Sequence, residues 1–174
     1  MFSIFKYFQK SSISPNNKKF LIVGLGNIGE EYKNTRHNIG FDIVDKLGKI
    51  LKGTFNSAKY GDILKSKYAG KQIILLKPNT FMNLSGKAVL YWLKKEKIHT
   101  NNLIVIVDDL NINFGVSRLK PSGSDGGHNG LKNITNSLNT SNFPRLRFGI
   151  GNNFKKKDQV DFVPVSYTHL TLPT

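Results

Sequence analysis

The sequence predicts a three-layer α/β domain in which helices flank a twisted, mostly parallel sheet. Two observations lead to this fold class. Several apolar runs of strand length have no polar alternation, which is typical of strands covered by helices on both faces. Stretches with helical spacing of apolar residues separate these runs, as expected for parallel strands joined by helical crossovers. The length of 174 residues and the 39% apolar content fit one domain with a real core.

Four runs are predicted to be core strands. The first is Lys19–Gly24 (KFLIVG), which ends in glycine. The others are Gln72–Leu76 (QIILL), Leu103–Val107 (LIVIV) and Leu146–Ile150 (LRFGI).

Three segments are predicted to be helices because their apolar residues recur at helical spacing. For the first helix we expect Asn38 to act as the N-terminal cap and Gly53 to end it. The residues that mark the three helices are Ile39, Ile43, Val44, Leu47, Ile50 and Leu51, then Ala88, Val89, Trp92 and Leu93, and then Leu131, Ile134 and Leu138.

The composition indicates an intracellular protein that binds a phosphate-rich partner. The chain has no cysteine, so thiol nucleophiles and disulfides are excluded. No stretch approaches the roughly 20 apolar residues of a membrane span. The net charge of +15 attracts nucleic acid, although a solvated basic surface explains the charge alone equally well. Between Leu110 and Lys157 the only acid is Asp125, and the cations are Arg118, Lys120, Lys132, Arg145, Arg147, Lys155, Lys156 and Lys157.

Gly24, Gly26 and Gly29 form a G-x-G-x-x-G pattern directly after the first strand, which is the dinucleotide-binding fingerprint. The surrounding sequence does not fit that interpretation. In a dinucleotide fold the third glycine lies inside a helix, whereas residues 30–38 (EEYKNTRHN) are almost wholly polar. The acid expected about 20 residues further on is also missing. We therefore do not expect a nicotinamide cofactor.

Polar residues follow several predicted strands, where open α/β sheets place their binding sites. Taken singly, each has a simpler interpretation as a turn, cap or loop residue. Because the loops come from one edge of the sheet, the set predicts a functional site there. Its members are Asn27, His37, Asn38, Asn83, Asp108, Asp109 and residues 126–130 (GGHNG).

The segments LIVGLGNIGEEYKNTRHNIGF, KPNTFMNLSGKAV, VDDLNINFG and GGHNGLKNI occur in this order. Together they resemble the signature blocks of bacterial peptidyl-tRNA hydrolases. The resemblance runs from about Lys19 to Val163. It implies a single domain with a mixed sheet, and an enzyme that hydrolyses the ester between a peptide and the 3′-terminal ribose of tRNA without metal or cofactor.

On matching positions, the resemblance implies that His37 is the catalytic base and that Asp108 orients its ring. A carboxylate bonded to one imidazole nitrogen fixes the tautomer, so the other nitrogen can take a proton from water. His128 is the closest rival for the base, but its place at a helix start favours a structural role. The chain has no G-x-S-x-G elbow, no H-E-x-x-H zinc site and no cysteine, which leaves water as the nucleophile.

The same resemblance implies a cleft with one further catalytic amide, Asn27, and residues that contact substrate on either side of the ester. These substrate-binding residues are Tyr32, Phe81, Met82, Asn83 and Asn129. For the acceptor stem and 3′ CCA end of the tRNA, the basic region supplies Arg118, Lys120, Lys132 and Arg147. We expect a cytoplasmic monomer that does not bind membranes.

The chain departs from the family in three places. Ile28 replaces a usual proline, and Asp109 and Asn111 replace what are often Glu and Asp. Residues 164–174 (PVSYTHLTLPT) match nothing in the family, so we expect an artefactual tail in place of a C-terminal helix. Residues 1–18 are expected to be a disordered basic extension, with an organelle transit peptide as the less favoured alternative. A non-catalytic RNA-binding module of the same fold, as in plant organelle splicing factors, is the alternative function.

Overall fold

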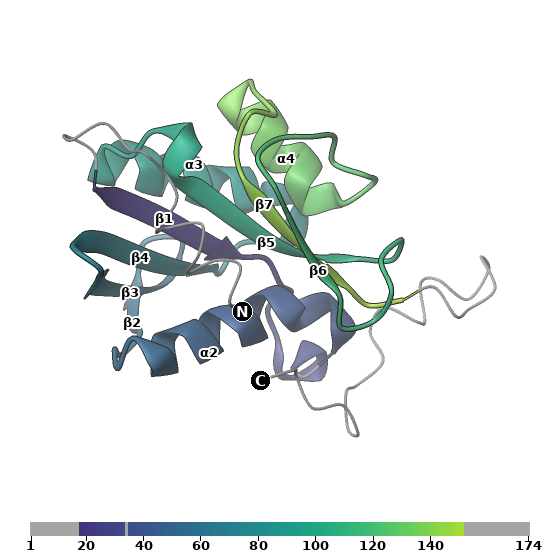
Figure 1. Cartoon of the computed structure of the whole chain (residues 1–174), viewed down its shortest axis with the longest axis horizontal. Helices are drawn as coiled ribbons and strands as arrows, with labels where there is room; N and C mark the ends of the chain where they lie inside the picture. Colours follow the sequence, from purple (N-terminus) through teal and green to yellow (C-terminus); the bar gives the residue numbers. More distant parts are fainter. Residues whose placement is uncertain (1–17, 34, 152–174) are drawn as a thin grey trace.

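The structure is a computed structural model that describes residues 18–33 and 35–151. These residues form one domain built on a seven-stranded sheet with the strand order β2-β3-β4-β1-β5-β7-β6 (Figure 1). The tail expected at residues 164–174 lies outside the described residues. The extension expected at residues 1–18 also lies outside them, except for residue 18. No helix in the described part of the chain is long and apolar enough to cross a membrane.

The centre of the sheet is parallel and its edges are antiparallel. Strand β1 pairs in parallel with β4 and β5, and β5 pairs in parallel with β7. The antiparallel pairs are β2 with β3, β3 with β4, and β6 with β7. The expected mixed sheet is thus confirmed, with its parallel part in the middle. The strands are β1 (Lys19–Gly24), β2 (Asn56–Ala58), β3 (Gly61–Tyr68), β4 (Lys71–Pro78), β5 (Leu103–Asp109), β6 (Ser117–Lys120) and β7 (Arg145–Gly149).

Helices cover both faces of the sheet, as the apolar strands predicted. Helix α2 (Ile39–Ile50) lies on one face, and α3 (Ser85–Glu96) and α4 (Asn129–Leu138) lie on the other (Figure 1). Side chains of β1 alternate between the two cores: Phe20 and Ile22 pack with α2, while Leu21 and Val23 pack with α3 and α4. Because both faces of the strand are buried, its sequence has no polar alternation. The described residues also contain four short 3-10 helices: η1 (Glu30–Tyr32), η2 (Arg36–Asn38), η3 (Met82–Leu84) and η4 (Thr100–Asn102).

The predictions for both ends of α2, a cap by Asn38 and an end at Gly53, are wrong. Asn38 does not cap the helix with its side chain. Its amide instead pairs with the backbone of Asn27, as described below. At the other end the helix stops at Ile50, and Lys52, not Gly53, takes the left-handed conformation, with φ of 51°. The amide of Gly53 still hydrogen-bonds the carbonyl of Gly48 at 3.1 Å, which satisfies the end of the helix.

Two glycines bring the first turn of α2 against the ends of the central strands. A Cβ atom on Gly24 would collide with the carbonyl of Gly40, and a Cβ atom on Gly40 would collide with the backbone of Leu25 and with the carbonyl of Ile106. The helix can therefore approach the backbone of β1 and β5 only because both positions lack a side chain. This contact places η2, which leads into α2, beside the carboxyl end of β5.

Candidate active site

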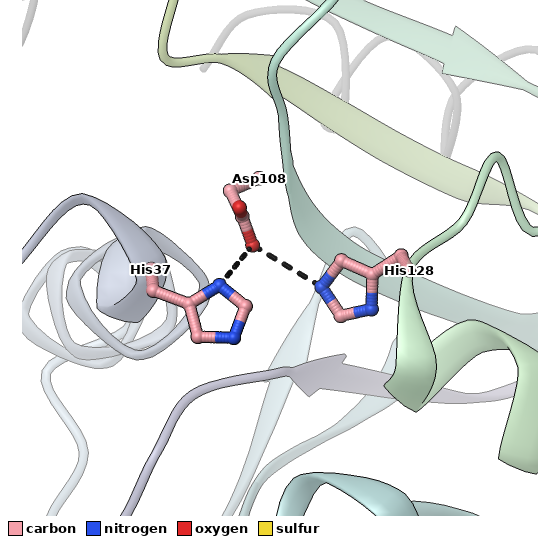
Figure 2. A group of neighbouring side chains, drawn as sticks. All are labelled: His37, Asp108 and His128. Atoms are coloured by element: carbon pink, nitrogen blue, oxygen red, sulfur yellow. Dashed lines mark hydrogen bonds and ion pairs between the residues drawn. The ribbon is translucent and has the colours of Figure 1, made fainter. Parts of the chain in front are cut away.

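The carboxyl ends of β1, β4 and β5 meet at one edge of the sheet, and this is where the predicted site residues gather. Asp108 lies near the end of β5, His37 lies in η2, and His128 directly precedes α4. Figure 2 shows the two imidazole rings on either side of the Asp108 carboxylate, both directed at the same oxygen. Three segments that are far apart in the sequence therefore form one cluster, as predicted for His37 and Asp108.

The Asp108 carboxylate is almost fully enclosed. Its side chain is 7% exposed, and its Oδ1 lies 3.0 Å from Nδ1 of His37 and 3.1 Å from Nε2 of His128. Burial by itself raises the pKa of a carboxyl group, but contacts with His128 and His37 outweigh burial and hold the pKa of Asp108 well below its usual range. Asp108 is therefore a stable, fixed negative charge at neutral pH.

His37 is the more accessible of the two rings, with 22% of its side chain exposed. Burial lowers the pKa of His37, but the contact with the Asp108 carboxylate and its negative charge outweigh burial and raise the pKa above the ordinary imidazole value. Since Nδ1 faces Asp108, Nε2 is the nitrogen left to accept a proton. This is the arrangement of a general base.

His128 joins the cluster in a way that the sequence did not indicate. Its Nδ1 accepts hydrogen bonds from the backbone amides of Gly130 and Leu131, at 3.1 and 3.4 Å, and so caps α4. The expected structural role is thus present, and the contact of Nε2 with Asp108 is additional. The G-G-H-N-G spacing predicted a helix start, but only the packing of α4 against the sheet brings the ring to Asp108.

Asn27, in the loop after β1, is held by Asn38, the residue that follows His37 in the chain. The Asn38 side chain accepts a hydrogen bond from the Asn27 amide at 2.6 Å and donates one to the Asn27 carbonyl at 3.0 Å. This pair of bonds fixes the backbone of the loop after β1, where Ile28 replaces the family's usual proline. The half-buried Asn27 side chain can then be presented at a constant position.

The residues expected to contact substrate lie on η1, η3 and the start of α4. Phe81 is 72% exposed, a high fraction for a large apolar side chain, and Asn83 and Asn129 are also exposed. Met82 packs partly into the core, with its sulfur against Gly130, and so joins η3 to α4. Tyr32 is half-buried at the end of η1. The exposed members are available for a ligand, whereas Met82 also has a structural role.

The four predicted cations differ in their availability. Arg118, Lys120 and Lys132 are exposed on β6 and α4. Arg147 is not, because its side chain is 16% exposed and its Nε lies 2.8 Å from Oδ2 of Asp109. The charge of Arg147 is thus already compensated, while the other three cations can meet phosphate.

A cavity of about 340 Å³ lies beside Asn27 and Asn38, on the side of α2. Its lining includes Glu30, Asp42 and Asp45 but none of the three cluster residues. Burial, together with the nearby charge of Asp45, raises the pKa of Asp42 to about 6. The cavity is therefore an acidic feature that shares Asn27 with the predicted site but contains none of the three cluster residues.

The ligand atoms of His37, Asp108 and His128 lie within 4.8 Å of one another, so these residues are the metal candidates in the described part of the chain. Both imidazole rings already contact the Oδ1 atom of Asp108, at 3.0 Å from Nδ1 of His37 and 3.1 Å from Nε2 of His128. A metal bound to Nε2 of His128 would have to displace the proton that this nitrogen carries while Nδ1 accepts from the helix. The cluster fits proton transfer without requiring a metal.

Known proteins share much of this sequence and this fold. A family model described as peptidyl-tRNA hydrolase matches residues 21–168. The peptidyl-tRNA hydrolase of Phocaeicola vulgatus is 54% identical over 156 residues, which cover 90% of this chain and 83% of that protein. The peptidyl-tRNA hydrolase of Parabacteroides distasonis is 57% identical over 145 residues, which cover 83% of this chain and 78% of that protein.

A solved structure of the peptidyl-tRNA hydrolase from Acinetobacter baumannii is similar with a TM-score of 0.81 at 38% identity, and the match covers 88% of this chain and 79% of that one. The ordered sequence blocks, the mixed sheet and these relatives lead to the same assignment. The chain belongs to the peptidyl-tRNA hydrolase family.

Proposed function

We propose that this protein hydrolyses the ester between a peptide and the 3′-terminal ribose of tRNA, with a water molecule activated by His37. The observation that carries this proposal is the 3.0 Å contact between Nδ1 of His37 and Oδ1 of the buried Asp108. That contact leaves Nε2 of an accessible ring as a base, and a positioned histidine base typically contributes about 10²- to 10⁴-fold to the rate.

In the first step, Nε2 of His37 takes a proton from water while the water oxygen attacks the ester carbonyl carbon. The imidazolium that forms is stabilised by the fixed charge of Asp108. In the second step, the bond from the carbonyl carbon to the ribose oxygen breaks, and His37 returns the proton to that oxygen. The products are a free 3′ hydroxyl on the tRNA and a peptide with a new carboxyl group.

The asparagines Asn27, Asn83 and Asn129 are proposed to bind the ester and the peptide backbone. An amide group can donate to a carbonyl oxygen and accept from a peptide N–H, which suits a substrate whose side chains vary. Donation to the ester oxygen would also stabilise the negative charge of the tetrahedral intermediate. Tyr32, Phe81 and Met82 are proposed to flank the ester, and the exposure of Phe81 favours contact with a ligand.

We further propose that exposed cations bind the phosphates of the acceptor stem. Arg118, Lys120 and Lys132 have the accessibility that this role requires. Arg147, paired with Asp109, is proposed to support the loop that precedes α4, because its guanidinium lies against Gly126.

We place the enzyme in the cytoplasm as a monomer that recycles tRNA from prematurely released peptidyl-tRNA. The chain has no cysteine and so needs no oxidising compartment. Light scattering at assay concentration tests the monomer.

The decisive test of the function compares N-acetylaminoacyl-tRNA with free aminoacyl-tRNA in a turnover assay. We expect hydrolysis of the N-blocked substrate and little hydrolysis of the free amine. Binding of tRNA without release of the acyl group would instead identify a non-catalytic RNA-binding module and contradict the proposal.

A further inference from the structure

We propose that His128 is a positioning residue for hydrolysis, whose Nε2–H holds the Asp108 carboxylate while its Nδ1 caps α4. This inference rests on the proposed function, since it concerns the carboxylate that orients the His37 base. It assigns to His128 a second function beyond that of a helix cap.

The hydrogen-bond partners of His128 assign its tautomer. A nitrogen that accepts from the amides of Gly130 and Leu131 cannot carry a hydrogen of its own. In a neutral imidazole the hydrogen is then on Nε2, which lies 3.1 Å from Oδ1 of Asp108. His128 is therefore a donor to Asp108, because the amides at the start of α4 keep Nδ1 as an acceptor and leave the hydrogen on Nε2.

The contact of Asp108 with His128 is better formed than its contact with His37. The distance from Nε2 of His128 to Oδ1 meets hydrogen-bond geometry. Nδ1 of His37 lies at a similar distance but has no aligned hydrogen-bond partner in the described structure. His128 also has the more enclosed side chain, 9% exposed against 22% for His37. Asp108 is thus held from the α4 side, and His37 can adjust to its substrate.

The start of α4 also keeps the ring in one orientation. Nδ1 faces two amide hydrogens at the positive end of the α4 dipole, so this nitrogen is held as an acceptor. His128 therefore binds the Asp108 carboxylate as a donor, and that carboxylate carries a fixed negative charge. The imidazolium of His37 is the group that this charge is left to stabilise.

Several other charged groups lie on the packed elements, and some of them are paired with one another or with the backbone. On β5 and β7, Asp109 pairs with Arg147, and Arg145 hydrogen-bonds the carbonyls of Ser124 and Ser141. The loop residue Asp125 accepts from the amide of Gly127. The remaining charged groups are Arg36 beside His37 on η2, the exposed Lys132 on α4, and Asp42, Asp45, Lys46 and Lys49 on α2.

Two substitutions separate the two functions of the ring. His128→Asn places an acceptor near the position of Nδ1 and can still cap α4, but its side chain is too short to reach Asp108. His128→Gln places an amide N–H near the position of Nε2 and can donate to Asp108, but it loses the cap. Each variant thus keeps one half of the imidazole.

For His128→Asn we expect kcat to fall by about 10- to 100-fold, the usual effect of losing a partner that orients a reacting group, with KM unchanged. We also expect the acid limb of the pH profile to move to higher pH. Asp108 would then have one donor fewer, so more of its charge would act on His37 and raise the pKa of that base. For His128→Gln we expect kcat and the acid limb close to those of the parent, with a lower melting temperature.

If His128→Asn has the parent's kcat and acid limb, or if both variants lose activity only in proportion to lost stability, His128 is a cap and the inference is wrong. A second readout does not depend on activity: nitrogen NMR of the full chain should show His128 with hydrogen on Nε2 and a bare Nδ1. Hydrogen on Nδ1, in either the neutral or the doubly protonated ring, would overturn the inference. His37→Ala distinguishes failure of the proposed function from failure of the inference about His128, because parental hydrolysis by that variant would contradict the proposed function itself.

Discussion

Two carboxylates near the first turn of α2 have opposite electrostatic behaviour. Asp108, at the end of β5, has its pKa held well below the usual range, whereas Asp42, on α2 beside the cavity, has its pKa raised to about 6. Burial raises the pKa in both cases, and the partners make the difference. Two imidazoles converge on Asp108, while Asp42 faces the like charge of Asp45, whose own carboxylate is paired with Lys77 at 2.7 Å. Burial alone is therefore a poor guide to function, and the donors around a buried acid are a better one.

The largest effect on activity is expected for substitution of His37, the imidazole that Asp108 orients. His37→Ala should lower kcat by about 10²- to 10⁴-fold, because no other described residue in this cluster presents a free imidazole nitrogen to solvent. Affinity for a non-hydrolysable acyl-tRNA should stay the same, since the base acts on water. Single-turnover kinetics and fluorescence titration measure the two quantities. Retained activity in this variant would place the base elsewhere.

Asp108→Asn should keep the fold and lower turnover by about 10²-fold or more, because an amide can hold the wrong tautomer and cannot stabilise the imidazolium. The acid limb of the kcat/KM profile should move to lower pH. The reason is that the carboxylate's raising effect on the pKa of His37 is lost, while the lowering effect of burial stays. A profile between about pH 6 and 8 that matches the parent's would contradict the pairing.

Asp42→Asn should stabilise the protein by about 1 to 2 kcal/mol at pH 7, since each pKa unit is worth about 1.4 kcal/mol and solvent screening of the half-buried side chain reduces the effect. A raised pKa means that the folded state prefers the protonated acid. The parent should therefore lose stability as pH rises from about 4 to 6, and the variant should not. Urea unfolding at pH 4.5 and 7, with Glu31→Gln as an exposed control, measures this difference. Asp108 has the opposite sign, because its contribution is present at neutral pH and is lost as pH falls below about 4.

The smallest effect is expected for single cations outside both acidic sites. Lys120→Ala and Lys132→Ala should each flatten the slope of log K against log salt by about 0.7 to 0.9. Turnover of a small ester substrate without tRNA should not change, because these residues contribute remote binding. Lys49→Ala is the matched control, an exposed lysine on α2 at the other face of the sheet. An equal change of the slope in Lys120→Ala, Lys132→Ala and Lys49→Ala would show that Lys120 and Lys132 belong to a general basic surface and not to a specific tRNA site. Arg147→Ala is expected to act mainly on stability, because it leaves the buried Asp109 without its partner.

The centre of the fold was predictable because its strands are buried on both faces. Strands β1, β4 and β5 contain the apolar runs that the sequence analysis identified, and β7 overlaps the fourth run except for Ile150. The helices α2, α3 and α4 follow their apolar spacing. The edge strands β2, β3 and β6 were not predicted. The sequence of β6, SRLK, has exposed or half-exposed side chains throughout, so its strand conformation comes from pairing with β7 and not from its own pattern.

The site divides in the same way. The amino-acid sequence by itself determined the four motif blocks, the family, and the placement of His37 and Asp108 at one edge of the sheet, because parallel strands bring their carboxyl ends together. The sequence could not show that His128 shares Asp108, that Asn38 holds Asn27, or that Arg147 is paired with Asp109. These contacts join residues that are 20, 11 and 38 positions apart, and they depend on how closely α2 and α4 pack on the sheet. Periodicity and spacing report which face of an element is buried, whereas a side-chain contact between elements is decided by tertiary packing.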